Sequence, residues 1–149
     1  MPSTVYLDRH RTSCHGREFW RLGLPPMDWN SWDCFGAGVT ESEVRANAEY
    51  MAEHLLRFGW EYVVIDIAWY NPGATGYPSP PATLEMDAHG RLLPAPNRFP
   101  SCGNGKGFKP LADEFHAKGL KFGIHIMRGV PRLAVERNCP VGAARPGPP

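Results

Sequence analysis

The sequence contains no run of apolar residues that approaches the roughly 20 needed to span a membrane as a helix. Its polar N-terminal stretch also lacks an apolar segment and carries Arg9, His10, Arg11 and Arg17, which is unlike a secretory signal peptide. These two absences predict no membrane association. If Met1 is the true start of the protein, they also predict a cytoplasmic location.

The sequence also lacks an excess of either charge, with 16 Lys and Arg against 15 Asp and Glu and a net charge of +1. No strong field therefore points to nucleic acid, and a small or neutral ligand fits better. The cysteines form no C-x-x-C pair and no tight spacing with histidine, so we expect no metal site and no cofactor. Their even number permits disulfides without predicting them; they are Cys14, Cys34, Cys102 and Cys139.

What is present divides into three regions. Residues 1–24 form a polar leader without periodicity, which we interpret as poorly ordered rather than as a nucleic-acid-binding arm. Residues 25–138 carry the periodic apolar segments, and residues 139–149 form a tail rich in proline and glycine. With 149 residues, 42% of them hydrophobic, the chain can bury one real core.

The clearest local signal is a helix start. A first short strand is expected at Met27–Asn30. Thr40 and Glu43 then have the spacing of a capping box, in which each side chain satisfies a free backbone N–H. Apolar residues continue at helical spacing after Thr40, and Gly59 is well placed to end the helix in a left-handed conformation.

The next segment, Tyr62–Ile67, is apolar except for Asp66. This pattern is typical of a strand that is covered on both faces in a parallel sheet. Asp66 falls near the C-terminal end of the strand, where parallel α/β folds bind ligands. The alternative is an aspartate that caps a turn or a helix, and the residues alone weigh the two readings equally.

A long connection rich in proline and glycine follows, from Trp69 to Gly107. We expect no helix in it, and because it leaves from the strand that carries Asp66, it is a candidate lid or pocket wall. The glycines at 103–107 lack the spacing of a phosphate-binding loop.

After this connection, the pattern predicts a helix from about Pro110 to Gly119, a strand at Leu120–Met127 and a helix at Arg132–Asn138. Strands that alternate with helices indicate an α/β fold with a parallel sheet. Periodicity alone does not separate a doubly wound sheet from part of an eight-stranded barrel.

Four segments together are specific enough to suggest a family. In their order along the chain they resemble the N-terminal portion of the α-galactosidase (melibiase) family of glycoside hydrolases. The resemblance implies a (β/α)8 TIM barrel, here truncated to about its first three βα units, and a retaining hydrolase of terminal α-D-galactosyl residues. The segments are Pro26–Gly36, Gly59–Asp66, Gly107–Asp113 and Gly119–His125.

The resemblance also implies three substrate-binding residues for a carbohydrate ligand. Trp29 is similar to the family's tryptophan that forms a wall of the sugar pocket, and Asp66 to an acid that accepts hydrogen bonds from sugar hydroxyls. His125 stands where the family places a pocket-lining residue, usually tyrosine. For His125 the alternative is a histidine that packs inside the barrel.

Three residues depart from the family pattern. Asp28 stands where glycine is usual, and Ala68 where many members have cysteine. Ile67 replaces a second sugar-binding aspartate, which removes a hydroxyl contact and puts strict galactose specificity in doubt.

Retaining glycosidases need two carboxyl groups about 5 Å apart. The resemblance implies that both are aspartates on the fourth and sixth strands of the barrel, beyond the residues of this chain, so we expect the isolated chain to be inactive. The alternatives are a non-catalytic carbohydrate-binding module completed by a partner at an open sheet edge, and a nonfunctional gene fragment.

Other acids and aromatics carry less weight. Surrogate catalysts are conceivable among the remaining acids, but loop and helix acids are more often solvated; the candidates are Glu85, Asp87 and Asp113. Three further tryptophans are interpreted as core or loop packing; they are Trp32, Trp60 and Trp69.

Overall fold

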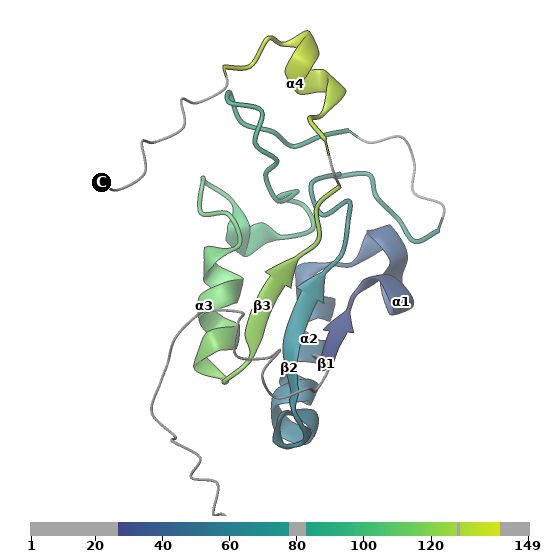
Figure 1. Cartoon of the computed structure of the whole chain (residues 1–149), viewed down its shortest axis with the longest axis vertical. Coiled ribbons are helices and arrows are strands. Elements are labelled where there is room, and N and C mark those ends of the chain that lie inside the picture. Colours follow the sequence, from purple (N-terminus) through teal and green to yellow (C-terminus); the bar gives the residue numbers. More distant parts are fainter. Residues whose placement is uncertain (1–26, 78–82, 128, 141–149) are drawn as a thin grey trace, which may run out of the picture.

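The computed structural model describes residues 27–77, 83–127 and 129–140. The predicted leader and all but the first two residues of the predicted tail lie outside these residues. Within them, three parallel strands form one sheet in chain order (Figure 1). The strands are β1 (Met27–Asn30), β2 (Trp60–Ile65) and β3 (Lys121–Ile124).

The helix between β1 and β2 begins as predicted. A short helix, α1 (Trp32–Phe35), leads to α2 (Glu41–Tyr50), whose capping box joins Thr40 and Glu43. The Thr40 N–H donates to Glu43 Oε2 at 2.7 Å. The helix continues through one π-helical turn and one 3-10 turn, and Gly59 ends it with φ +91°. That left-handed conformation is the one for which glycine was expected.

The second strand ends earlier than predicted. It stops at Ile65, so Asp66 follows it directly and Ile67 lies in the turn rather than in the strand. The Ile67 N–H donates to Asp66 Oδ1 at 2.7 Å, which removes it from the ladder, and Ala68 then turns left-handed with φ +65°. A local side-chain bond has therefore replaced strand pairing.

The third unit is also shorter than predicted. α3 (Lys109–Ala117) starts beside Pro110 as expected, but β3 ends at Ile124, and the last helix, α4 (Arg132–Glu136), stops before Asn138. β3 pairs only with β2 among the described strands, and β2 has ended by this point. Ile126 and Met127 therefore have no neighbouring described strand to pair with, and they are 58% and 55% exposed.

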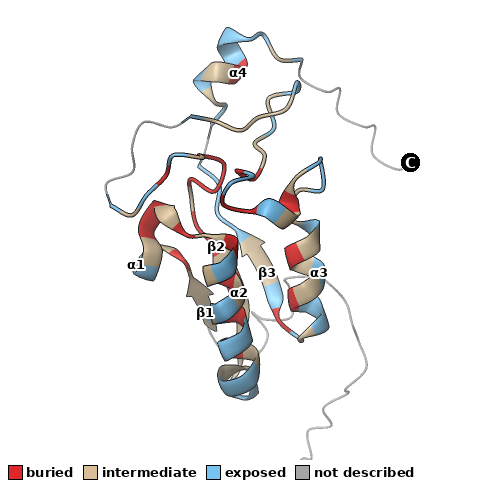
Figure 2. Ribbon diagram, turned by 180° about the vertical axis from the view of Figure 1, so that it is seen from behind, coloured by how far each residue is buried: buried red, intermediate tan, exposed pale blue. Residues whose placement is uncertain are grey.

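The main core lies between the sheet and the helices α2 and α3. Figure 2 shows α2 lying across the sheet and α3 beside β3, with buried residues along their inner sides. Val63 and Ile65 of β2 are fully buried, whereas Val64 between them is only partly covered. The buried cluster consists of Val39, Val44, Ala48, Met51, Val63, Ile65, Trp69, Tyr70, Phe99, Cys102, Leu111, Phe115 and Leu120.

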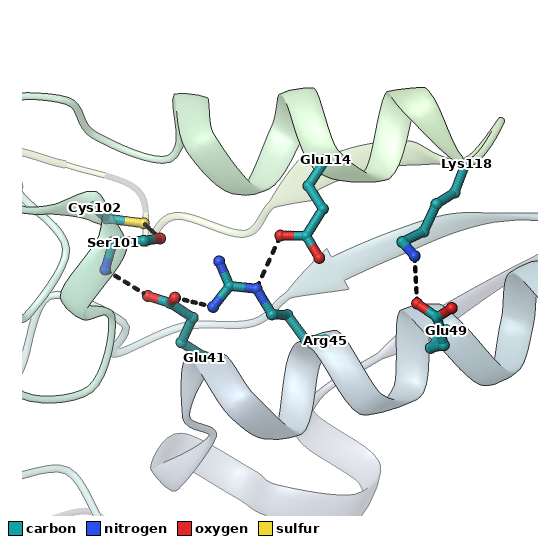
Figure 3. A network of polar contacts seen from close by, with 7 residues as sticks. All are labelled: Glu41, Arg45, Glu49, Ser101, Cys102, Glu114 and Lys118. Atoms are coloured by element: carbon teal, nitrogen blue, oxygen red, sulfur yellow. Dashed lines mark hydrogen bonds and ion pairs between the residues drawn. The ribbon is translucent and has the colours of Figure 1, made fainter.

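Charged side chains join the two helices above this core (Figure 3). Arg45 of α2 forms an ion pair with Glu41 and donates from Nε to Glu114 of α3 at 2.8 Å. The Glu41 carboxylate also accepts the Ser101 N–H at 2.9 Å, which ties the long connection to the helix start. Lys118 and Glu49 form a second ion pair between the helices. This network links α2 to α3 and to the long connection.

The long connection is more ordered than the proline content suggested. It contains a 3-10 turn at Pro100–Cys102, with proline at its start, and an antiparallel bridge between Met86 and Leu92. The prediction of no helix is therefore wrong for that single turn, because proline is tolerated at the first helical position. None of the helices in the described part of the chain is long and apolar enough to cross a membrane.

Candidate functional site

The parallel register brings three polar residues together at the carboxyl edge of the sheet. Asn30 pairs with Val64, and Ile65 pairs with Ile124, so the strand ends lie side by side. The ladder is extended by the His125 N–H, which donates to the Ile65 carbonyl at 2.8 Å. Asn30, Asp66 and His125 consequently meet at one edge, where parallel sheets bind ligands.

The Asp66 carboxylate is the centre of this cluster. Its Oδ2 accepts a hydrogen bond from Asn30 Nδ2 at 2.8 Å and lies 3.2 Å from His125 Nδ1. Its Oδ1 accepts the Ile67 N–H, and its own backbone N–H donates to Ser31 Oγ at 2.9 Å. Asp66 is only 8% exposed. The carboxylate is therefore held in one orientation by neighbours from all three strand ends.

These neighbours also favour the ionised form of Asp66. Burial raises the pKa of the carboxyl, but the Ile67 N–H, the Asn30 amide and the His125 ring lower it by more, so the pKa lies below its usual value. Asp66 is thus a carboxylate at neutral pH. An ionised carboxylate accepts hydroxyl hydrogen bonds more strongly than a neutral acceptor does.

His125 stands next to Asp66 with its ring accessible. Its side chain is 55% exposed, and its backbone carbonyl accepts the Trp69 indole N–H at 3.0 Å. Trp69 is buried, in agreement with its interpretation as a packing residue. The buried indole fixes the backbone of His125, while the imidazole faces the open edge of the site.

The third predicted site residue, Trp29, lies elsewhere. It pairs in register with the buried Val63, packs against the main core and contacts the Phe35 ring edge-on at 6.2 Å. Residues paired across a ladder share one face of the sheet, so Trp29 lies on the core side. The structure does not join it to the Asp66 cluster, and its role as a sugar-pocket wall stays a prediction.

Sequence reasoning missed Asn30 and Ser31 and treated Trp32 as packing. Trp32 packs partly buried against a small cluster that includes Ala68, and its backbone N–H donates to Asn30 Oδ1 at 2.8 Å. It also contacts the exposed Tyr77 ring edge-on at 4.9 Å. The available signal was position: Asn30 ends a predicted strand and Ser31 and Trp32 directly follow it, at the edge where ligands bind.

Two of the three other candidate acids form ion pairs with nearby basic residues. Asp113 pairs with Lys109 at 2.5 Å and Asp87 with Arg91 at 2.6 Å. Cys34, Cys102 and Cys139 are free thiols. Within the described ranges, no three His, Cys, Asp or Glu side chains are grouped so that they could hold a metal ion.

Comparison with known proteins identifies the family of this chain. A family model described as alpha galactosidase A matches residues 24–134. The chain belongs to the α-galactosidase A family of glycoside hydrolases. An α-galactosidase from Coffea arabica is 39% identical over 106 residues, which is 70% of this chain and 24% of that enzyme. A chicken (Gallus gallus) α-N-acetylgalactosaminidase is 35% identical over 112 residues.

Solved structures of this α-galactosidase A family give the same result. A family 27 β-L-arabinopyranosidase from Geobacillus stearothermophilus, in complex with arabinose, matches 87% of this chain with 60% identity and a TM-score of 0.81. The chain covers 30% of that enzyme, and thus spans less than a third of it. Because these neighbours are TIM-barrel enzymes, the predicted fold, about the first three βα units of a (β/α)8 barrel, is confirmed.

Proposed function

We propose that this chain supplies the sugar-binding N-terminal part of a retaining glycoside hydrolase that acts on terminal pyranosides of galactose-like configuration. The observation that carries the proposal is the Asp66 carboxylate, which is ionised and held beside His125 at the carboxyl edge of the sheet. Such a carboxylate accepts two sugar hydroxyls in charge-assisted bonds, and this supports a carbohydrate as the ligand.

Within this class, we propose that β-L-arabinopyranosides are preferred over α-D-galactosides. L-Arabinopyranose has the ring configuration of galactopyranose but lacks the hydroxymethyl group, so it presents one hydroxyl fewer to the protein. Ile67, next to Asp66, provides no hydroxyl acceptor in its side chain where the family resemblance implies an aspartate. The β-L-arabinopyranosidase that is 60% identical to this chain supports this preference.

We propose that the hydrolysis step needs catalytic residues other than Asp66 and His125. A retaining mechanism uses one carboxylate as nucleophile and a second carboxyl group as acid and base, about 5 Å apart. Family resemblance places both on later strands than β3. The role of this chain is then to bind and orient the sugar through Asp66 and His125, and the isolated 149-residue chain is predicted to show no turnover.

The experiment is a chimera. Residues 24–134 of this chain replace the matching segment of the Geobacillus arabinopyranosidase, and kcat/KM is measured on a chromogenic β-L-arabinopyranoside. Asp66→Asn keeps the size of the side chain but removes the charge, and we expect a loss of about 10- to 100-fold, the value of one hydrogen bond to a charged group. The matched control is Asp113→Asn on the exposed surface of α3, which should change nothing. Equal activity of the Asp66→Asn and unsubstituted chimeras would refute the sugar-binding role.

A second candidate function is a carbohydrate-binding module that a partner completes through an open sheet edge. The observation in its favour is that β3 pairs on one side only among the described strands, and that exposed apolar residues lie at its end and just after it. These are Ile124, Ile126, Met127 and Val130. Arabinose or galactose binding by the chain alone, without turnover in the chimera, would favour this module over the enzyme.

A further inference from the structure

One charged side chain of the long connection is almost completely buried. Arg98 is 5% exposed, and no acidic side chain forms an ion pair with it in the described part of the chain. Burial lowers the pKa of its guanidinium to about 10, with Glu43 opposing the shift, so it stays charged at neutral pH. A buried charge of this kind is costly unless its hydrogen-bonding capacity is met in full.

Backbone carbonyls meet that capacity. The Arg98 Nε–H donates to the Val39 carbonyl at 3.1 Å, and Nη2 donates to Val39 and Ala37 at 2.6 and 2.7 Å. Nη1 donates to the carbonyls of Ala68 and Asn71 at 2.7 and 3.0 Å. A guanidinium has five N–H donors in a fixed planar fork, so every donor is used. Lysine has three donors and no fork.

The accepting carbonyls belong to the loops after β1 and β2, two of the three strand ends that meet at the candidate site. Ala37 and Val39 follow β1, and Ala68 and Asn71 follow β2. Ala68 comes two residues after Asp66 and has a left-handed backbone, which costs a non-glycine residue about 1 kcal/mol or more. Such a conformation persists only where the surroundings hold it, and the Arg98 bond to the Ala68 carbonyl is one such restraint.

We propose that Arg98 is a positioning residue, which joins the loops after β1 and β2 and so sets the orientation of Asp66 and Ile67 toward the sugar. This inference rests on the proposed function for the identity of the ligand. The restraint on the turn after β2 stands on the contacts of Arg98 alone.

The first test uses the unsubstituted 149-residue chain and no sugar. Nitrogen-15 NMR of the arginine side chains should give separate, slowly exchanging signals for the Nη protons of Arg98. Arg91, whose side chain is 77% exposed, should give averaged signals. Averaged signals for Arg98 would overturn the proposal, because a fork that rotates freely holds no loop.

The second test measures the pKa of the Asp66 carboxyl by carbon-13 NMR, again without sugar. In Arg98→Lys we expect it to rise toward the ordinary value of about 3.9, because the turn that presents the Ile67 N–H loosens. The control is Arg45→Met, which removes the ion pairs of Arg45 with Glu41 in α2 and with Glu114 in α3, and should lower stability without moving the Asp66 pKa. Equal shifts in both variants would mean general loosening and would contradict positioning.

A rescue variant separates positioning from bulk stability. Glycine adopts the left-handed backbone of residue 68 without strain. Adding Ala68→Gly to Arg98→Lys should therefore restore part of the lost stability and lower the Asp66 pKa back toward its value in the unsubstituted chain. The same change in the unsubstituted chain should do less, which gives a measurable coupling between the two positions. Additive effects would overturn the proposal. If Arg98→Lys alone does not fold, restored folding in the double variant supports the proposal. A double variant that also fails to fold, together with averaged Arg98 Nη signals in the unsubstituted chain, refutes it.

The last test measures activity on a sugar substrate. In the arabinopyranosidase chimera, Arg98→Lys should lower kcat/KM at least 10-fold while Arg45→Met lowers it little. A chimera without any activity would contradict the proposed function. The measurements made without sugar would still decide whether Arg98 holds the turn.

Discussion

Asp66 and Ile67 are neighbours in the chain but present opposite chemistry at the carboxyl edge of the sheet. The first is an ionised acceptor with three hydrogen-bond partners for its carboxylate oxygens, and the second is an apolar side chain that offers sugar hydroxyls no partner. The bond between the Asp66 carboxylate and the Ile67 N–H makes them one turn. In the proposed function, these adjacent positions would distinguish the hydroxyl pattern of the sugar.

At this scale we expect a pH-dependent contribution of Asp66 to stability. Its pKa is lower in the folded chain than in the unfolded chain, so its contribution is fully present above the unfolded pKa of about 3.9. The contribution is lost as the pH falls through the folded pKa. Urea unfolding from pH 6 to pH 2 should show a steeper acid loss of stability in the unsubstituted chain than in Asp66→Asn. Parallel curves would contradict the low pKa.

Ile67 should control the choice between two sugars. In the chimera, Ile67→Asp supplies a carboxylate for one more hydroxyl, and we expect the ratio of kcat/KM for α-galactoside over β-L-arabinopyranoside to rise by about 10-fold or more, as one charge-assisted hydrogen bond predicts. Ile67→Leu, which stays apolar, is the matched control and should leave the ratio unchanged. An unchanged ratio in Ile67→Asp would show that Ile67 does not determine the preference between the two sugars.

Single residues were only partly predictable from the sequence. Asp66 was found because a lone acid at the end of an apolar strand breaks a regular pattern. Asn30 and Ser31 follow too short a strand to create such a contrast, and only the register with β2 reveals their contact with Asp66. Arg98 lies in a proline-rich connection without periodicity, and its bonds reach carbonyls 27 to 61 residues away.

Elements were predicted best where the cause is local. The start of α2 follows from Thr40 and Glu43, and the end of the helical segment that continues it follows from Gly59, because caps depend on residues within one turn. The ends of β2 and β3 were placed wrongly, because they depend on pairing between strands. Asp66 takes the Ile67 N–H out of the ladder, and no apolar pattern in the sequence records that competition.

The contact between α2 and α3 should depend on Arg45. Arg45→Met removes the bond to Glu114 of α3 and leaves the Glu41 carboxylate, which is 3% exposed, without its ion pair, and we expect a loss of about 1–2 kcal/mol in the free energy of unfolding. Arg91→Met, which removes an ion pair of a 77% exposed side chain, should change it by less than about 0.5 kcal/mol. Urea titrations measure both free energies of unfolding. Equal losses in the two variants would show that the ion pairs of Arg45 stabilise the chain no more than the exposed pair of Arg91 does.

At the scale of the whole molecule, the edge of β3 that faces away from β2 should decide whether the chain associates, because β2 is the only described strand that pairs with β3. A strand edge that carries exposed apolar residues favours pairing with another chain. We expect the isolated chain to associate as its concentration rises, and Ile124→Lys to reduce that association by placing a charge on the edge. Val135→Lys, on the exposed side of α4, is the control and should leave it unchanged. Analytical ultracentrifugation gives the result, and a monomer at all concentrations would argue against association through this edge.

The most direct measurement is hydrolysis of a chromogenic β-L-arabinopyranoside by the purified 149-residue chain, beside the chimera at the same concentration. We expect turnover by the chimera alone, because in the proposed function this chain binds and orients the sugar while later strands of the barrel supply the catalytic carboxyl pair. Turnover by the chain itself that disappears in Asp66→Asn would contradict it, since the catalytic pair would then lie within these residues.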